Sequence, residues 1–317
     1  MKVFITGISG FAGSHLADLL VKNGNEVLGT YLTEESLVNV SSIKDKLELL
    51  KVNLLDEKSI HNIISEKKPD VVYHLAAIAS AAKSFKNPIE TLTNNIAAEI
   101  NILEAIRNAN LMDAKIFIVA SGDMYGLVDS QNIPISENAP FMPTNPYAVS
   151  KITQDYLALQ YFLTYKLHII RARPFNHIGP RQGLGFVVAD FAKKIVDIEK
   201  GNSEHVLRVG NLDAKRDFTD VRDMVKAYDL LLEKGDSGEA YNIGSGVSHS
   251  IKDIVTLMQS RAKVKFDISY DESLMRPSDN PELTCNADKM KKLTGWKPEI
   301  LLEKTIEDIL DYWRSIV

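Results

Sequence analysis

The sequence has only one cysteine, Cys285, among its 317 residues. A single cysteine excludes an intramolecular disulfide and is typical of a reducing compartment. Long hydrophobic runs are also missing, since no stretch approaches the roughly 20 apolar residues of a membrane span. The apolar N-terminal run is interrupted by glycines and followed by His15 and Asp18, which is unlike a signal peptide. We therefore expect a cytoplasmic protein that makes no membrane contact.

An excess of basic residues is absent as well. The chain has 37 Lys and Arg against 42 Asp and Glu, and its formal net charge is −5. This balance argues against a general nucleic-acid binder, which would carry a basic footprint. The hydrophobic share of 45% and the charged share of 25% are ordinary for a globular protein. The length suggests about two folding units with a core that needs no metal, and we expect no bound metal.

The first half of the chain alternates short apolar runs with helical patterns. We expect strands at 3–6, 26–31, 47–52, 71–75, 115–120 and 167–171, and helices at 13–23, 59–67, 93–108 and 146–165. The strands are apolar without strict alternation, as a sheet covered on both faces requires. This βαβ order predicts the α/β class, with a Rossmann-type doubly wound parallel sheet.

The pattern changes after about residue 175, where Gly-rich turn signals multiply. Helices are expected at 186–200, 220–234, 250–262 and 303–315, separated by short strands. We interpret 1–175 as a dinucleotide-binding Rossmann domain and 176–317 as a smaller C-terminal α/β substrate domain. The segment 218–246 is expected to rejoin the first domain, because Ala240–Ile243 has the composition of a strand of the large sheet.

A glycine-rich turn follows the first expected strand. Gly7, Gly10 and Gly13 frame Phe11 and Ala12 in the run TGISGFAG. Missing side chains allow a tight turn, a close approach of backbone N–H groups to a pyrophosphate, and close helix packing. The helix that follows presents its N-terminus, where free N–H groups favour negative charge. A glycine triplet alone could be a structural turn, but this position between strand and helix predicts a dinucleotide site.

Tyr147 and Lys151 lie four residues apart in the expected helix 146–165, so they share one helix face. A free tyrosine titrates near about 10, and a neighbouring ammonium is expected to lower that value. Such a phenol can exchange a proton with a substrate oxygen. By itself this spacing is common by chance and would describe an exposed helical pair. The glycine turn and the serine described next favour the catalytic interpretation.

Ser121 follows the expected strand 115–120. Strand ends in doubly wound sheets face the ligand crevice, so its hydroxyl could orient a reacting oxygen. A lone serine at such a place could also be a helix cap. The run Ser121-Gly122-Asp123-Met124-Tyr125-Gly126, together with the GxxGxxG turn and the YxxxK pair, resembles the extended, sugar-nucleotide-modifying branch of the short-chain dehydrogenase/reductase superfamily.

The resemblance implies roles for individual residues. Ser121, Tyr147 and Lys151 would be catalytic, with Asp123 as an additional acid. His74-Leu75-Ala76-Ala77 also matches family positions near the cofactor, although His74 could equally be a core histidine. The residues that the resemblance assigns to the cofactor are Gly7, Gly10, Phe11, Ala12, Gly13, Asn53, Leu54, Leu75, Ala76, Ala77, Asn94, Tyr147 and Lys151.

The choice between NAD and NADP depends on the end of the second strand. An acid there would bind the ribose hydroxyls of NAD, and an Arg would bind the extra phosphate of NADP. The chain has Thr30-Tyr31-Leu32 followed by Thr33-Glu34-Glu35, with neither an acid nor an Arg at the expected place. The missing acid favours NADP, and NAD stays open.

Further motifs extend the resemblance to the sugar-nucleotide end. Residues 175–182 (FNHIGPRQ), 210–217 (GNLDAKRD), 276–279 (RPSD) and 295–298 (GWKP) are similar to motifs of GDP-mannose-processing members. Guanidinium groups clamp a diphosphate in bidentate fashion. The residues that the resemblance assigns to the substrate are Asn176, Val187, Lys193, Arg216, Arg276 and Asp279. Lys193 could instead be a solvated charge on its helix.

The resemblance favours reduction of the 4-keto group of GDP-4-dehydro-6-deoxy-D-mannose to GDP-D-rhamnose. A 4,6-dehydratase acting on GDP-mannose needs a longer acid, where this chain has Gly122 and the shorter Asp123. That activity and a 4-epimerase with tightly bound NAD stay open. A non-catalytic dinucleotide sensor would be expected to lose Tyr147 or Lys151.

Two long helices, 93–109 and 146–165, resemble the pair through which family members form homodimers. Leu157, Tyr161 and Phe162 could face a second copy or the intramolecular core. The expected partners are therefore a GDP-sugar and a second copy of this chain.

Overall fold

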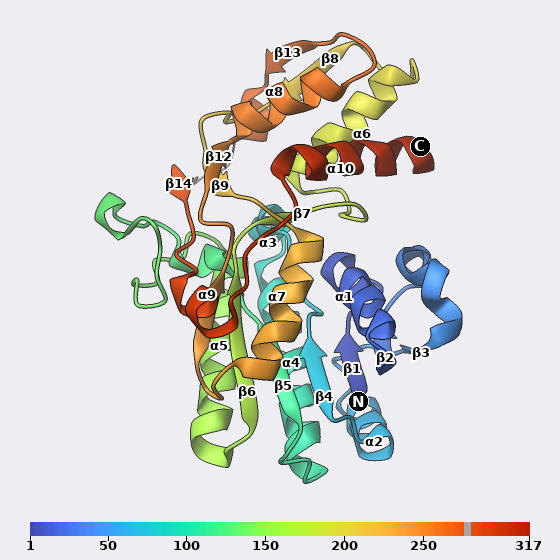
Figure 1. Cartoon of the computed structure of the whole chain (residues 1–317), viewed down its shortest axis with the longest axis vertical. Coiled ribbons are helices and arrows are strands. Elements are labelled where there is room, and N and C mark those ends of the chain that lie inside the picture. The colour runs from blue at the N-terminus through green and yellow to red at the C-terminus, as the bar shows by residue number, and fades with distance from the viewer. Residues whose placement is uncertain (276–279) are drawn as a thin grey trace.

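A seven-stranded parallel sheet forms the lower part of the computed structural model, which describes residues 1–275 and 280–317 (Figure 1). The strand order is β11-β6-β5-β4-β1-β2-β3. This confirms the predicted Rossmann-type doubly wound sheet. Its strands are β1 (Lys2–Thr6), β2 (Glu26–Tyr31), β3 (Leu47–Lys51), β4 (Val71–His74), β5 (Lys115–Val119), β6 (His168–Pro174) and β11 (Ala240–Ile243).

Helices cover both faces of the sheet, and neighbouring residues of a strand enter different cores. Ile5 packs in the cluster under α1 (Phe11–Lys22) and α7 (Val221–Lys234). Phe4 packs in the cluster under α2 (Glu57–Lys67), α4 (Pro88–Asn108) and α5 (Pro146–Tyr165). Both side chains are fully buried, and burial of each stabilises the fold by about 1.5–3 kcal/mol. This two-sided burial explains why the strands lack an alternating pattern.

Helix boundaries follow the local capping residues. α5 begins at Pro146, and the side chain of Asn145 accepts a hydrogen bond of 2.8 Å from the Ala148 N–H. α4 begins at Pro88, five residues before the expected start, because proline suits a first turn where its missing N–H costs nothing. The short elements were not expected, since they carry little hydrophobic periodicity. They are η1 (Glu34–Lys46), α3 (Ala81–Lys86), η2 (Gly122–Tyr125), η3 (Ser130–Asn132), η4 (Glu272–Leu274) and α9 (Asp288–Thr294).

A smaller α/β part lies at the top of Figure 1. Its helices α6 (Val187–Glu199), α8 (Ile251–Arg261) and α10 (Leu302–Ile316) enclose a separate hydrophobic core. β8 (Val206–Val209) pairs in parallel with β13 (Asp267–Tyr270). Figure 1 shows β7 (His177–Ile178), β9 (Lys215–Asp217), β12 (Ser248–Ser250) and β14 (Glu282–Leu283) between this part and the main sheet. β10 (Thr219–Asp220) pairs with β7.

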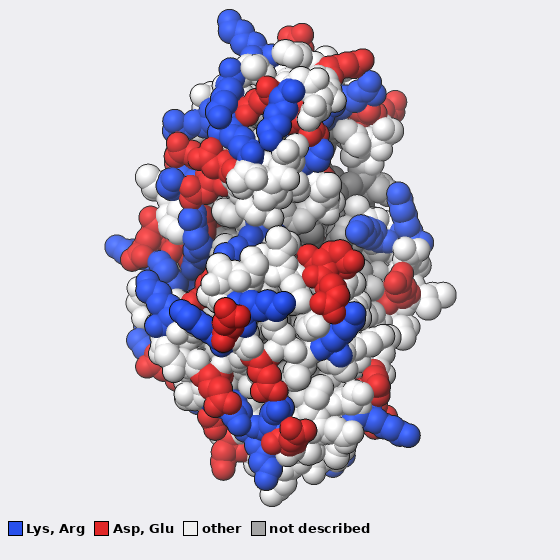
Figure 2. All heavy atoms as spheres, turned by 90° about the vertical axis from the view of Figure 1, so that its right-hand side faces the viewer, with Lys and Arg blue, Asp and Glu red and all other residues white. Residues whose placement is uncertain are grey.

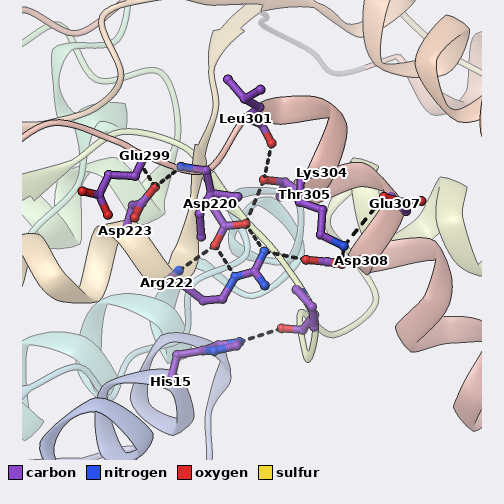
Figure 3. Close-up of polar contacts among 12 residues, drawn as sticks. His15, Asp220, Arg222, Asp223, Glu299, Leu301, Lys304, Thr305, Glu307 and Asp308 are labelled. Carbon is purple, nitrogen blue, oxygen red and sulfur yellow. Dashed lines mark hydrogen bonds and ion pairs between the residues drawn. The ribbon is translucent and has the colours of Figure 1, made fainter.

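The two parts are connected by more than one chain crossing. β11 lies beside β6, and α7 packs on the main sheet, so the second half of the sequence contributes to the sheet and its cover. Figure 3 shows the polar link between α7 and α10. The buried carboxylate of Asp220 accepts hydrogen bonds from Arg222 at 2.7 Å and from Thr305 at 2.8 Å. Arg222 also pairs with Asp308 at 2.8 Å, which ties the start of α7 to α10.

Charged side chains are mixed on the face seen in Figure 2, where Lys and Arg alternate with Asp and Glu. This mixture agrees with the small net charge of −5. Within residues 1–275 and 280–317, no helix has the length and apolar character needed to cross a membrane.

Candidate active site

A cleft of about 690 Å³ runs along the carboxyl edge of the main sheet and reaches α6 of the smaller part. Residues that follow β1, β2, β4, β5 and β6 line it, as expected for ligand sites in doubly wound sheets. The predicted site residues that line this cleft are Gly7, Gly10, Phe11, Ala12, Gly13, Asn53, Leu54, Leu75, Ala76, Ala77, Asn94, Ser121, Asp123, Tyr147, Lys151, Asn176 and Val187.

The glycine turn has the shape that a pyrophosphate requires. Gly7 has φ +70°, which favours glycine, and a Cβ at Gly13 would lie 2.2 Å from the Gly7 carbonyl oxygen. Gly10 precedes α1 without a side-chain cap, so the first N–H groups of the helix face the cleft without a capping side chain. These residues fit a dinucleotide, because side-chain-free backbone and a helix N-terminus meet at one place.

The cleft beyond β2 is lined by hydroxyl and amide groups that the sequence analysis missed. Ser36 and Asn39 line it together with Ser9. The hydroxyls of Ser9 and Ser36 are 2.7 Å apart, and the Asn39 amide donates to the Ser9 carbonyl at 2.9 Å. Ser36 and Asn39 come from the 3₁₀ segment η1, whose sequence has no regular hydrophobic pattern and therefore gave no indication of this role. Glu34 instead pairs with Lys51 at 3.1 Å.

Tyr147 and Lys151 lie on the same face of α5 and are both buried. Lys151 Nζ is 5.9 Å from the centroid of the Tyr147 ring. The ammonium donates a hydrogen bond of 2.7 Å to the Val119 carbonyl, at the end of β5. This bond holds the lysine at the floor of the cleft, one helical turn from the phenol.

Ser121 and Asp123 approach Tyr147 from the end of β5. Ser121 is the N-cap of η2, and its hydroxyl accepts a hydrogen bond of 3.1 Å from the Asp123 N–H. Burial raises the pKa of Tyr147 above its ordinary value, and the negative charge of Asp123 raises it further, whereas a hydrogen bond with Ser121 lowers it. This direction is opposite to the lowering expected from the sequence, because desolvation of the phenolate outweighs the other effects. The phenol therefore holds its proton at neutral pH.

His74 belongs to the core rather than to the cleft wall. It is fully buried, and its Nδ1 lies 2.9 Å from the Thr6 hydroxyl. The hydroxyl oxygen accepts from the N–H groups of Leu75 and Ala76, so its own hydrogen points to His74. Burial lowers the pKa of His74 to about 3, which keeps the imidazole neutral.

The predicted substrate residues divide into two groups. Asn176 and Val187 line the cleft, but Lys193 and Arg216 are not among its lining residues. Lys193 pairs with Asp197 at 2.6 Å, one turn farther along α6. This ion pair is closer to the alternative given above, in which Lys193 is a charge on the surface of its helix. Arg216 donates to the carbonyls of Lys215 and Asn280 at 2.8 and 2.7 Å. Arg276 and Asp279 lie outside the described residues.

Residues of the run FNHIGPRQ that had not been singled out also reach the cleft, among them His177 and Arg181. The His177 ring stacks on Phe11 of the glycine turn, with centroids 5.7 Å apart and an angle of 8°. Arg181 lines the cleft and pairs with Asp18 of α1 at 2.7 Å. The run therefore connects the glycine turn to the start of the smaller part. Its position directly after β6 could have indicated this role.

Comparisons with known proteins agree with this geometry. Residues 4–309 match the family model described as GDP-mannose 4,6 dehydratase. The chain is 35% identical to GDP-6-deoxy-D-mannose reductase of Pseudomonas aeruginosa, over 100% of this chain and 98% of that protein. It is 29% identical to a GDP-mannose 4,6-dehydratase of Vibrio cholerae, over 96% of this chain and 91% of the relative.

A solved structure has the same fold along its whole length. It is described as RMD from Pseudomonas aeruginosa complexed with NADPH, and it superposes with a TM-score of 0.86 at 33% identity. The match covers 100% of this chain and 99% of that one.

Proposed function

The chain belongs to the GDP-mannose 4,6 dehydratase family of NAD(P)-dependent nucleotide-sugar enzymes, and we propose that it reduces GDP-4-dehydro-6-deoxy-D-mannose to GDP-D-rhamnose with NADPH. The observation that carries this proposal is the buried Tyr147 phenol, which keeps its proton beside Ser121 in a cleft that fits a dinucleotide. A reduction at a carbonyl needs a proton donor at the oxygen, and a protonated phenol supplies it.

Each residue then has one task. When bound, the reduced nicotinamide supplies a hydride to carbon 4 of the sugar. Tyr147 gives its phenolic proton to the carbonyl oxygen, which becomes a hydroxyl, and is left as tyrosinate. The Ser121 hydroxyl, which lines the same cleft, orients that oxygen. The Lys151 ammonium binds the nicotinamide ribose and stabilises the tyrosinate by its charge.

Asp123 favours the reductase over the dehydratase. A dehydratase needs a carboxylate that reaches the proton on carbon 5, and the side chain of Asp123 is one methylene shorter than a glutamate there. Its charge acts on the Tyr147 phenol instead, where it opposes ionisation. An acid that keeps Tyr147 protonated suits a proton donor. The 35% identity to the reductase relative supports the same choice.

We assign NADPH rather than NADH to the cleft beyond β2. In the described part of the chain, Ser9, Ser36 and Asn39 line this region, and neither Glu34 nor Glu35 does. Neutral hydroxyl and amide groups can donate hydrogen bonds to a phosphate on the adenosine ribose, whereas a carboxylate would repel it. The relative whose structure contains NADPH supports this assignment.

The sugar nucleotide is assigned to the part of the cleft that Asn176 and Val187 line. Within the division proposed from the sequence, 1–175 with 218–246 holds the cofactor and the rest of 176–317 holds the GDP-sugar. Arg216 and Arg276 are the proposed diphosphate ligands. Arg216 is not among the residues that line the cleft in this structure.

A second copy of the chain is the proposed partner of α5. Val149, Tyr156 and Leu163 are seven residues apart on this helix and are 41%, 54% and 57% exposed. An apolar stripe of this kind is typical of an interface. Tyr161, in contrast, is buried and donates to Glu104 at 2.7 Å, so it serves the intramolecular core. Light scattering should give a dimer mass for the wild type and a monomer mass for Tyr156→Glu.

The decisive experiment is a reaction with purified GDP-4-dehydro-6-deoxy-D-mannose. We expect one NADPH oxidised per keto sugar, followed at 340 nm, with slower oxidation of NADH. Formation of the keto sugar from GDP-mannose without added cofactor would instead establish the dehydratase. Interconversion of two GDP-sugars without net oxidation would establish an epimerase.

The cytoplasm is the proposed compartment, since Cys285 is a free, buried thiol.

A further inference from the structure

A buried carboxylate lies behind the cleft, on α4. Glu99 is 0% exposed, and neither of its carboxylate oxygens has a hydrogen-bond partner within the described residues. The sequence analysis did not single it out, because a Glu in the middle of a long helix reads as a surface charge. Burying an unpaired carboxylate is costly, so a compensating positive charge is expected near it.

The packing of α4 against α5 places Glu99 opposite the catalytic helix face. Near the start of α4, the Asn95 amide donates to the Ser150 hydroxyl at 2.9 Å. Farther along, the Tyr161 hydroxyl donates to Glu104 at 2.7 Å. Glu99 lies one turn after Asn95, between these two contacts. At that height α5 presents Lys151 and Gln154. Burial raises the pKa of Glu99 well above its ordinary value, and Lys151 and Gln154 both oppose that rise.

Lys151 needs such a partner. It is 3% exposed, and the hydrogen bond that holds it goes to an uncharged group, the Val119 carbonyl. An ammonium can donate three hydrogen bonds, and burial disfavours its charge. Burial accordingly lowers the pKa of Lys151, while the Glu99 carboxylate raises it.

The other titratable groups nearby do not supply this charge. Asp155 on α5 acts on Glu99, but its carboxylate already pairs with Arg171 at 2.7 Å and Arg173 at 2.8 Å. His74 on β4 is neutral, since its pKa is about 3. Tyr147 is protonated because burial raises its pKa. Glu99 is left as the group whose negative charge can balance Lys151.

We propose that Glu99 is the counter-ion of Lys151, a positioning residue that keeps the ammonium charged and held at the floor of the cleft. The inference rests on the proposed function only in giving Lys151 a task in the reaction. Glu99 itself touches neither substrate nor cofactor, because it acts from behind the helix that carries the catalytic side chains.

The pair predicts the direction in which the lysine titrates. Without the negative charge of Glu99, burial acts unopposed and the pKa of Lys151 falls. The ammonium is then lost at a lower pH, and any binding that needs it weakens earlier as the pH rises.

The test compares Glu99→Gln with Glu104→Gln, the same substitution one turn farther along α4. Protein labelled with ¹³C at the lysine ε-carbons is titrated by NMR, and the Lys151 signal is identified by its loss in Lys151→Met. We expect the Lys151 midpoint to fall by at least about one pH unit in Glu99→Gln and to stay in place in Glu104→Gln. Glu99→Asp should recover part of the shift. NADPH affinity of Glu99→Gln should decline between pH 6 and pH 9 more than that of the wild type.

An unchanged Lys151 midpoint in Glu99→Gln would overturn the proposal. It would mean that Glu99 is protonated and uncharged in the wild type, so that it gives Lys151 no counter-charge. If Glu99→Gln does not fold, thermal unfolding of Lys151→Met and of Lys151→Met/Glu99→Gln decides the question. The proposal requires the double variant to be the more stable, because it removes a carboxylate left unpaired by the first substitution. Equal or lower stability of the double variant would reject it. These measurements need no keto sugar. They can therefore be interpreted even if the proposed reaction is not found.

Discussion

The Lys151 ammonium lies 5.9 Å from the centroid of the Tyr147 ring and bonds to the Val119 carbonyl at 2.7 Å. The Ser121 side chain acts on the phenol and lowers its pKa, against the larger effect of burial. Different neighbours therefore act on the Lys151 ammonium and the Tyr147 phenol, although both groups line the same cleft. Tyr147 keeps its proton in the resting site, and Lys151 is positioned to act after the proton leaves.

Removing the phenolic hydroxyl should abolish most of the catalysis and leave cofactor binding intact. Tyr147→Phe is expected to lower kcat by about 10²–10⁴-fold, the usual contribution of a general acid. NADPH binding, measured by fluorescence, should change little. Tyr165→Phe is the matched control, since Tyr165 is partly exposed at the end of α5. Unchanged turnover in Tyr147→Phe would show that the phenol is not the proton donor, and a wild type without turnover would favour a non-catalytic dinucleotide sensor.

Neutralising Asp123 should shift the pH profile of the reaction. The Asp123 charge raises the pKa of Tyr147, so Asp123→Asn is expected to lower it. The protonated donor is then lost at a lower pH, and the alkaline decline of kcat should move to lower pH. Rates across pH 8–12 in the wild type and the variant measure this. A decline that stays in place or moves to higher pH would show that the carboxylate does not act on the phenol.

The glycine turn should not accept a methyl group at Gly13. An added Cβ would lie 2.2 Å from the Gly7 carbonyl oxygen, so the backbone must move. Gly13→Ala is expected to destabilise the protein by about 1–3 kcal/mol, as overpacking does, and to weaken NADPH binding. A Cβ at Gly183 meets no atom within 4 Å, so Gly183→Ala should leave the free energy of unfolding within about 0.5 kcal/mol. Equal urea midpoints for both variants would contradict the close contact.

His74 should contribute to acid sensitivity. Burial lowers its pKa from 6.5 to about 3, so the folded state disfavours the charged imidazole that the unfolded chain can form. The contribution to stability is complete above about pH 6.5 and is lost as the pH falls from there toward 3. His74→Asn cannot gain this proton and should lose less stability between pH 7 and pH 4.5. Urea unfolding at both values measures the loss, and a larger loss in the variant would contradict the argument.

Sequence patterns predicted much of the fold and part of the site. Local hydrophobic runs indicated the strands, because each must be buried on both faces of the sheet. The glycines at 7, 10 and 13 indicated a phosphate-binding turn, since a Cβ at Gly13 would collide with the backbone. The four-residue spacing of Tyr147 and Lys151 placed both on one face of α5. These features depend on neighbours close in sequence, which is why the sequence reveals them.

Other features depend on contacts between distant segments. Ser36 and Asn39 reach the cleft because η1 folds back over the glycine turn, and nothing in their local sequence indicates this. Motif similarity placed Lys193 at the substrate, whereas the packing of α6 pairs it with Asp197.

The sequence by itself determined which residues can do chemistry: a phosphate-binding turn, a phenol and an ammonium at helical spacing, and a serine at a strand end. Tertiary structure decided their protonation and partners. Burial keeps Tyr147 protonated, and the packing of α4 against α5 lets the charge of Glu99 act on Lys151. The reason is physical, since desolvation and charge act through space and depend on which segments fold together.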